Sequence, residues 1–265
     1  MIRGAPTKGA RGPRLAITVF GLLVLLEAAS VMFAVNRAPV AASARGLRGN
    51  RFAQLFVPEG ESVVIARRAP TIVVDGDLSE WPDAHFVDLT HWRTSTRDGG
   101  PAPNGLSARA AVMWNDDTLY LAVEVIDPLH TNDQAGSEIW RGDSIQMGFD
   151  SGSNGGETYD SDDVELGWAR TSAGDRSYQW VGPAPGGFGG TAFVSARQDH
   201  ATRYELRLEA ATLRRQRLLA GDSLGFSIVV HDSNGGPWRG ALEWTPGMLF
   251  GKHPASFGIM RLLDV

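Results

Sequence analysis

The chain has 265 residues, of which 43% are hydrophobic, enough for one large domain or two small ones with a hydrophobic core. It contains no cysteine, which excludes disulfides, thiolate metal sites and cysteine nucleophiles. The formal net charge of −5 divides unevenly: residues 1–69 carry ten Lys/Arg and three Asp/Glu, whereas residues 70–265 carry 15 Lys/Arg and 27 Asp/Glu, a balance that argues against nucleic acid as a partner.

Residues 15–35 form a mostly apolar stretch that follows a basic tail at 1–14. About 20 apolar residues span a bilayer as a helix, and basic residues before the span favour a cytoplasmic N-terminus. We therefore predict a membrane anchor, with the membrane as a partner through this helix and the rest of the chain outside the cytoplasm. A cleaved signal peptide is the alternative, because small residues follow at 40–44, and it would yield a secreted or periplasmic protein.

The chain beyond this stretch changes character at about residue 70. Residues 36–69 are rich in Ala, Arg and Gly and are predicted to form a linker or stalk that ends in a short strand at 62–66. Residues 70–265 carry strand patterns separated by Gly-rich turns, with one short helical piece at 210–219. The expected strands are 71–74, 108–114, 118–126, 144–149, 164–170, 177–181, 191–197, 202–209, 224–231, 240–244 and 256–262. This pattern predicts an all-β fold, an antiparallel β-sandwich with jelly-roll-like connections.

Two loops concentrate acidic side chains. Asp127, Asp133 and Asp143 belong to one loop, and they converge if that loop folds back on itself. Calcium is a hard cation that takes six to eight oxygen ligands, so this trio is a candidate calcium site. The second candidate set is Asp150, Asp160, Asp162 and Asp163. Acids in a solvated loop are an equally good interpretation of the second set.

No known catalytic motif is present in the sequence. It lacks a Gly-x-Ser-x-Gly elbow, a His-Glu-x-x-His pair and a phosphate-binding loop. A glycosidase needs two carboxylates about 5–10 Å apart, but with 27 acids after residue 69 some pair meets that distance by chance. We predict that the protein is not an enzyme.

An ordered set of short motifs over residues 70–263 resembles the family 9 carbohydrate-binding modules, which often accompany xylanases. The matching pieces are Val74-Asp75-Gly76 with Trp81, Trp114-Asn115-Asp116-Asp117 with Leu119-Tyr120, Val125-Ile126-Asp127-Pro128, Ile139-Trp140 with Asp143-Ser144-Ile145, Phe149-Asp150, Tyr159 with Asp162-Asp163, and Ser256-Phe257-Gly258 before Arg261-Leu262. The resemblance implies a β-sandwich with structural calcium that holds the end of a glucan or xylan chain between two Trp rings.

The resemblance also implies which residues contact the sugar. Trp140 falls on the first position of the clamp, and an aromatic ring suits the apolar C–H face of a sugar. Gln146 stands where the family uses a Glu to bind hydroxyl groups, and an amide both donates and accepts hydrogen bonds. The second clamp Trp has no counterpart, and Phe250 is the nearest aromatic residue. Trp168 lies beside the position of a sugar-contacting Arg in the family.

The sequence thus predicts an exported, membrane-tethered, non-catalytic module that binds a xylan- or glucan-type polysaccharide or oligosaccharide. Two alternatives stay open. One is a structural domain of the envelope with a degenerate sugar site. The other is a haem-binding electron-transfer sandwich with Met or His as axial ligands; Met113 and Met147 are candidates, although each of these suits core packing better.

Overall fold

Strands account for nearly all the regular structure of the part of the chain that a computed structural model describes, which comprises residues 61–96, 100–186 and 191–265. The strands are β1 (Val63–Arg68), β2 (Val87–Leu89), β3 (His91–Arg93), β4 (Ser107–Asn115), β5 (Thr118–Ile126), β6 (Ser144–Asp150), β7 (Asp163–Thr171), β8 (Gly174–Val181), β9 (Thr191–Gln198), β10 (Ala201–Glu209), β11 (Ser223–Asp232), β12 (Gly240–Glu243) and β13 (Gly258–Leu263). Four short 3-10 helices join them: η3 (Leu78–Glu80), η4 (Gly136–Arg141), η5 (Ala210–Leu213) and η6 (Pro254–Ser256). The all-β prediction is confirmed.

The predicted tail, apolar stretch and most of the linker lie outside these residues, so the membrane anchor stays a prediction. Within the part that the structure describes, no helix has the length and apolar character needed to cross a bilayer.

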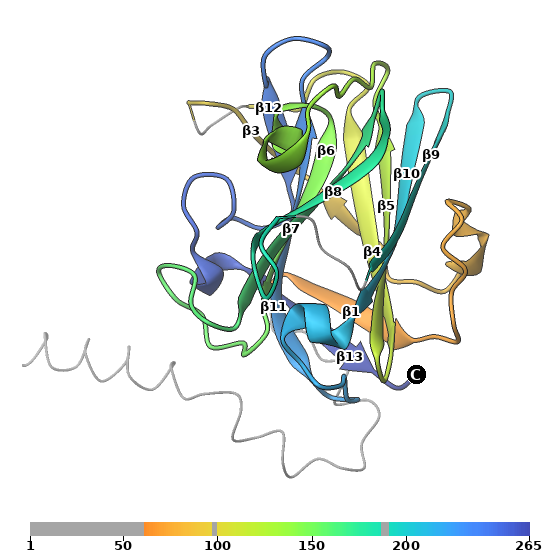
Figure 1. Cartoon of the computed structure of the whole chain (residues 1–265), viewed down its shortest axis with the longest axis vertical. Coiled ribbons are helices and arrows are strands. Elements are labelled where there is room, and N and C mark those ends of the chain that lie inside the picture. Colours follow the sequence, from red (N-terminus) through yellow and green to blue (C-terminus); the bar gives the residue numbers. More distant parts are fainter. Residues whose placement is uncertain (1–60, 97–99, 187–190) are drawn as a thin grey trace, which may run out of the picture. The chain divides into compact units, whose positions relative to one another are not determined.

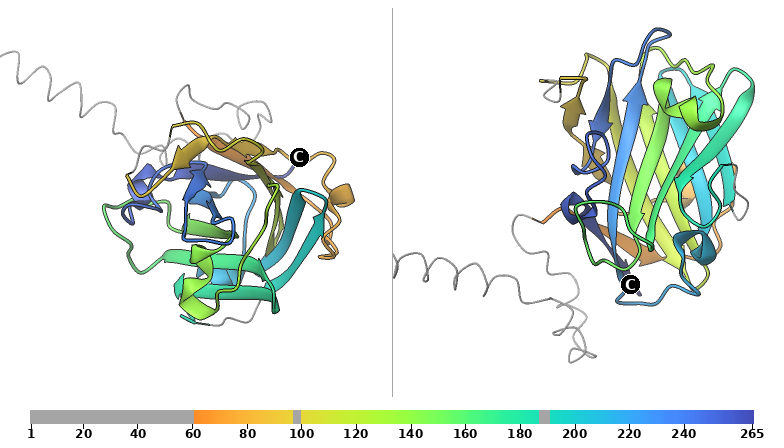
Figure 2. Two further views of the ribbon diagram at one scale, coloured as in Figure 1. Left: turned by 90° about the horizontal axis from the view of Figure 1, so that it is seen from above. Right: turned by 60° about the vertical axis from the view of Figure 1, so that its left-hand side comes forward.

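The strands form one continuous hydrogen-bonded sheet that bends round on itself. Its order is β8-β7-β6-β11-β13-β1-β4-β5-β10-β9, with β12 beside β11, β3 beside β12 and β2 beside β4. The view from above in Figure 2 shows the sheet wrapping round a central core. The two halves enclose a large hydrophobic cluster to which both contribute, for example Val112 and Leu121 from one half and Met147 and Leu166 from the other. This arrangement is consistent with the predicted sandwich.

Side chains tie the two ends of the strand order together. The Ser195 backbone N–H of β9 donates to Asp175 Oδ2 of β8 at 2.8 Å, and the Ser195 hydroxyl donates to the same carboxylate. Arg170 of β7 donates to the Ser195 carbonyl at 3.2 Å. Edge strands expose unpaired backbone groups, and these contacts satisfy part of that edge.

β1 is the short strand predicted at the end of the linker, and it belongs to the sheet of the domain. It runs through the middle of the sheet and pairs in parallel with both β13 and β4, as seen in orange in Figure 1. Val64 and Ala66 are fully buried in the main core. β1 lies where the sequence predicts a short strand at 62–66, and this strand supplies core side chains and ladder hydrogen bonds to the domain. The two parallel pairings are also an exception to the expected antiparallel pattern.

Residues 71–74 are irregular, in contrast to the strand predicted there. The residues that follow bond to a side chain and not to a neighbouring strand: the N–H groups of Asp75 and Gly76 donate to Glu205 Oε2 at 3.0 and 2.9 Å. Trp81 Nε1 donates to Glu205 Oε1 at 2.9 Å, and Glu205 is fully buried. Gly76 has φ +85, and a Cβ there would lie 2.9 Å from the Cβ of Ala196. The Asp-Gly turn and the Trp thus form a cradle for one carboxylate of β10.

The helical piece expected at 210–219 is a single short turn, η5. It ends at Arg214, which adopts a left-handed conformation with φ 56. A non-glycine residue with positive φ does not continue a helix, so the segment turns away after one turn.

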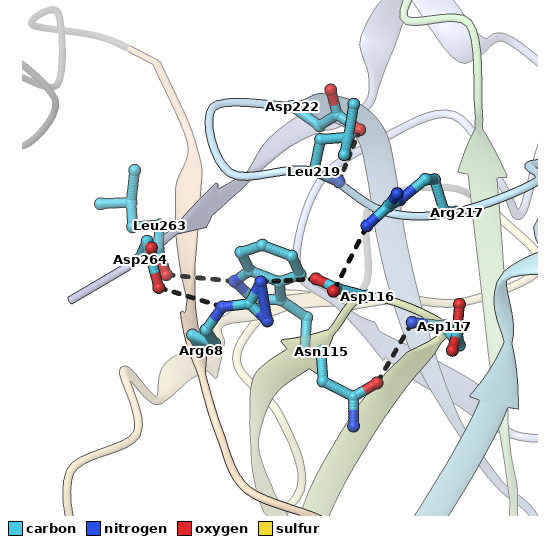
Figure 3. A network of polar contacts seen from close by, with 10 residues as sticks. Arg68, Asn115, Asp116, Asp117, Arg217, Leu219, Asp222, Leu263 and Asp264 are labelled. Atoms are coloured by element: carbon cyan, nitrogen blue, oxygen red, sulfur yellow. Dashed lines mark hydrogen bonds and ion pairs between the residues drawn. The ribbon is translucent and has the colours of Figure 1, made fainter. Parts of the chain in front are cut away.

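Arg68 joins the N-terminal strand to the C-terminal end of the domain (Figure 3). It bonds Asp116 at 2.5 Å and Asp264 at 3.0 Å. Its guanidinium also lies 4.5 Å from the ring centroid of the buried Trp114, whose Nε1 donates to the Leu263 carbonyl at 3.1 Å.

We expect Arg68→Ala to lower the free energy of unfolding by about 1–2 kcal/mol, mainly through the lost contact with Trp114, because exposed ion pairs contribute little. Urea unfolding measures it. Arg217→Ala, which removes one exposed 3.3 Å ion pair to Asp116, is the matched control and should change stability by less than about 0.5 kcal/mol. Equal losses in the two variants would contradict this account.

Candidate functional site

The loop that carries Trp140 is held in place by a buried amide. Asn132 Nδ2 donates to the carbonyls of Ile139 at 2.9 Å and Asp143 at 3.1 Å, on either side of the Trp. Ile139 is 1% exposed and anchors η4 from below, whereas Trp140 is partly exposed. In Figure 1, η4 is the green helical turn beside β6 and β8. The loop is therefore rigid at its base and presents an aromatic ring at its surface.

Trp140 lies in a groove of about 550 Å³ on the outer face of the β6, β7, β8 and β11 region. The lining residues are Ser95, Trp140, Gln146, Tyr159, Glu165, Trp180, Val181, His231, Trp238, Met248, Leu249, Phe250 and Lys252. Trp140, His231 and Trp238 form one aromatic cluster, with ring centroids 6.0–6.3 Å apart. Aromatic and apolar side chains with a few fixed polar groups are typical of small-molecule sites.

The floor of the groove is a chain of hydrogen bonds that crosses three strands. Trp238 Nε1 donates to His231 Nδ1 at 3.0 Å, and His231 Nε2 lies 2.8 Å from Gln146 Oε1. The Gln146 amide N–H donates to Glu165 Oε1, which also accepts from Lys252 Nζ at 2.7 Å. Each bond fixes the orientation of the next group.

The protonation state of this chain follows from its first member. An indole N–H only donates, so His231 Nδ1 accepts and its Nε2–H donates to Gln146. Burial lowers the pKa of His231 to about 3, with a further contribution from Lys252, so the ring is neutral at physiological pH. Gln146 is thereby oriented with its oxygen toward His231 and its NH2 toward Glu165. Lys252, with a side chain 43% exposed, carries further N–H groups for a bound molecule.

Three of the four residues predicted to bind sugar line the same groove: Trp140, Gln146 and Phe250. Trp168 does not, because it is fully buried in the main core. Adjacent residues of a strand face opposite sides, and it is Gly167 that faces the groove. Five further residues line the groove and were not predicted from the sequence: Glu165, Trp180, His231, Trp238 and Lys252. Polar residues alternate with core residues on β6, β7 and β11, and this pattern indicates a polar outer face. Only the register between these strands shows which of the polar residues lie together.

Three buried carboxylates converge beside the same loop. One oxygen from each of Asp127, Asp143 and Asp232 lies within 4.8 Å of the others, the only such acidic group among the residues described here. Asp143 and Asp232 each have a pKa raised to about 6, chiefly by burial. Asp232 Oδ1 is buried and has no hydrogen-bond partner, whereas its Oδ2 pairs with Arg239 at 2.6 Å. An orphaned carboxylate oxygen in a concentration of negative charge suits a hard divalent cation such as calcium.

This cluster differs from the predicted trio in one member. Asp133 is exposed and lies outside it, while Asp232 comes from the end of β11, about ninety residues along the chain from Asp143. The second acidic set, around residues 150–163, does not form such a group. Its carboxylates bond the N–H groups of their own loop, as Asp150 does with Gly155 at 2.8 Å.

The two Met residues of the haem alternative do not share a site. Met147 belongs to the main core, whereas Met113 packs on the other face of β4 with Trp81 and Ile72. Both act as core side chains.

Residues 74–264, well over half of the chain, match the family model described as carbohydrate family 9 binding domain-like. The chain belongs to this family. A family 9 carbohydrate-binding module from Caldicellulosiruptor kristjanssonii, solved in complex with cellotriose, superposes on the domain with a TM-score of 0.63 and 17% identity, covering 77% of this chain and 95% of that one. The glucose complex of a family 9 module from the same organism gives a TM-score of 0.64, also at 17% identity, and covers 77% and 97%.

This family 9 domain also resembles part of longer proteins. It is 25% identical over 208 residues to endo-1,4-beta-xylanase A of Thermotoga maritima and 23% identical over 215 residues to that of Thermotoga neapolitana. Each match covers 77% of the chain but only 18% of the xylanase. The xylanase matches therefore concern a fraction of those proteins.

Proposed function

We propose that the groove binds carbohydrate and that the domain is a non-catalytic binding module for xylan- or glucan-type chains. The observation that carries this proposal is the partly exposed Trp140 ring beside an ordered row of polar groups, Gln146, Glu165 and Lys252. A sugar has an apolar C–H face and hydroxyl groups at its edge, and the groove offers a surface for each. The family and its glucose and cellotriose complexes support the same assignment.

In this proposal Phe250 covers the ligand from the other side of the groove. It is 37% exposed, although most Phe side chains are buried, and it lies on the same loop as Lys252. Lys252 supplies donors to sugar hydroxyls, and Gln146 acts mainly by holding Glu165 and His231 in place.

The proposal has two further parts. Calcium bound by Asp127, Asp143 and Asp232 would hold the loop below Trp140, because Asp143 closes that loop and already bonds the N–H groups of Thr131 at 2.5 Å and Ser233 at 2.7 Å. The apolar stretch at 15–35 would place the domain outside the cytoplasm, tethered to the membrane.

Trp140→Ala is expected to weaken binding of xylo- or cello-oligosaccharides about tenfold, because stacking on an aromatic ring is worth about 0.5–1.5 kcal/mol beyond its buried area. Isothermal titration calorimetry with calcium present measures it. Leu219→Ala removes an exposed apolar side chain outside the groove and serves as the control. The proposal fails if the wild-type protein binds no member of a broad glycan panel, which would leave a structural role, or if Trp140→Ala binds as well as wild type.

A further inference from the structure

Trp180 lines the groove with part of its side chain exposed. It comes from β8 and is partly exposed. The outer edge of its six-membered ring packs against Gly167 of β7: a Cβ at Gly167 would be 2.5 Å from Cζ3 and 2.6 Å from Cη2. Real contacts never come so close, so the ring packs in the space that the missing side chain leaves. The sheet therefore holds this edge of the indole, while Trp180 also lines the groove.

Two contacts fix this ring in its position. Its Nε1 donates to the Ser137 carbonyl of η4 at 3.1 Å, and the neighbouring Tyr178 ring packs at 5.2 Å with an interplanar angle of 60°. This hydrogen bond satisfies the indole N–H, the only polar group of the ring, within the protein. The part of Trp180 presented to the groove is therefore an aromatic surface, held with little freedom to move.

Trp180 and Trp140 occupy different walls of the groove. Trp140 packs against His231 and Trp238 on the β11 side, whereas Trp180 packs on β7 and β8. Both residues are held by η4: Trp140 belongs to it, and Trp180 donates a hydrogen bond to its Ser137 carbonyl. Gln146, which pairs with Gly167 in the β6–β7 register, is a polar group next to the Trp180 ring.

We propose that Trp180 is a second stacking surface, so that the groove binds an oligosaccharide with one sugar unit on Trp140 and another on Trp180. This rests on the proposed function and deepens it by setting the length of ligand that fills the groove: two or more linked sugars, whereas a single sugar binds only at Trp140. Each platform contacts one sugar face, and binding energy therefore rises with chain length until both platforms are covered.

The experiment compares ligands of one to four units from the cello- or xylo-oligosaccharide series, titrated by calorimetry into wild type, Trp180→Ala, Trp180→Phe and Gly167→Ala. Trp180→Ala should lower the affinity for the trisaccharide about tenfold and leave that for the monosaccharide unchanged. Trp180→Phe keeps a ring and should retain most of the trisaccharide affinity. Gly167→Ala leaves the Trp in the sequence but displaces its ring, and should reproduce the loss in Trp180→Ala.

Unfolding curves establish that each variant is folded. If Gly167→Ala does not fold, the comparison of Trp180→Ala with Trp180→Phe still tests the proposal. The proposal of a second platform is wrong if Trp180→Ala binds the trisaccharide as tightly as wild type does. It is also wrong if Trp180→Ala loses as much affinity for the monosaccharide as for the trisaccharide. If Trp140→Ala weakens binding while Trp180→Ala does not, only this inference fails. If wild type binds no sugar of either series, the proposed function fails with it.

Discussion

Replacing Glu205 with Ala is expected to lower the free energy of unfolding by about 3–5 kcal/mol, the largest effect of a single substitution proposed for this domain. The Glu205 carboxylate accepts from two backbone N–H groups and one indole N–H, and its removal leaves these donors without an acceptor. An unsatisfied buried donor costs about 1–3 kcal/mol, which sets the size of the loss. Urea unfolding followed by Trp fluorescence measures it.

Glu209→Ala is the matched control for this prediction. Glu209 lies on the same strand, is exposed, and makes no side-chain hydrogen bond to the turn that follows it. Its replacement should change stability by less than about 0.5 kcal/mol. Trp81→Phe removes only the indole donor and should give a smaller loss than Glu205→Ala. The account of the cradle is wrong if Glu205→Ala is no less stable than Glu209→Ala.

Calcium is expected to stabilise the wild-type domain by about 2.7 kcal/mol at a concentration one hundred times its dissociation constant. Three carboxylate oxygens lie within 4.8 Å of one another, Arg239 pairs with only one oxygen of Asp232, and the other oxygen has no hydrogen-bond partner. A cation bound only in the folded state neutralises part of this negative charge and bonds to the free oxygen. Thermal unfolding with calcium and with EDTA measures the shift.

Asp232→Asn should lose most of this stabilisation, since it removes one charged ligand from the cluster. Asp133→Asn is the control: it replaces an exposed aspartate of the same loop that lies outside the cluster, and it should keep the full response to calcium. A response lost in Asp133→Asn and kept in Asp232→Asn would restore the trio expected from sequence. No response in wild type would remove calcium from the proposal.

Much of the fold followed from local patterns. The strands at 118–126 and 144–149 were predicted within a residue of their bounds, because alternation of apolar and polar residues over five to nine positions is a local signal. β2 and β3, with three residues each, are too short to show it. Residues 71–74 show a strand pattern but are irregular, because their neighbours bond the buried Glu205 about 130 residues away.

The site residues, too, were only partly predictable from the sequence. Trp140, Gln146 and Phe250 were inferred from the resemblance to the family, and all three line the groove. Trp168 was assigned to the wrong face because its neighbour Gly167 takes the outward position on β7. Trp180, which has no distinguishing motif, is identified only through its packing on that glycine.

The sequence by itself determined the all-β class, most strand positions and the family, since these depend on residue order and short-range periodicity. Only the tertiary structure decided which polar side chains share a site. Gln146 meets Glu165 across 19 residues of chain and Lys252 meets Glu165 across 87, and Asp232 joins Asp127 and Asp143 from another strand. The first of these encounters depends on the register of β6 and β7, because a shift of one residue would turn Gln146 or Glu165 to the opposite face. The others depend on how loops distant in the chain return to the same part of the sheet.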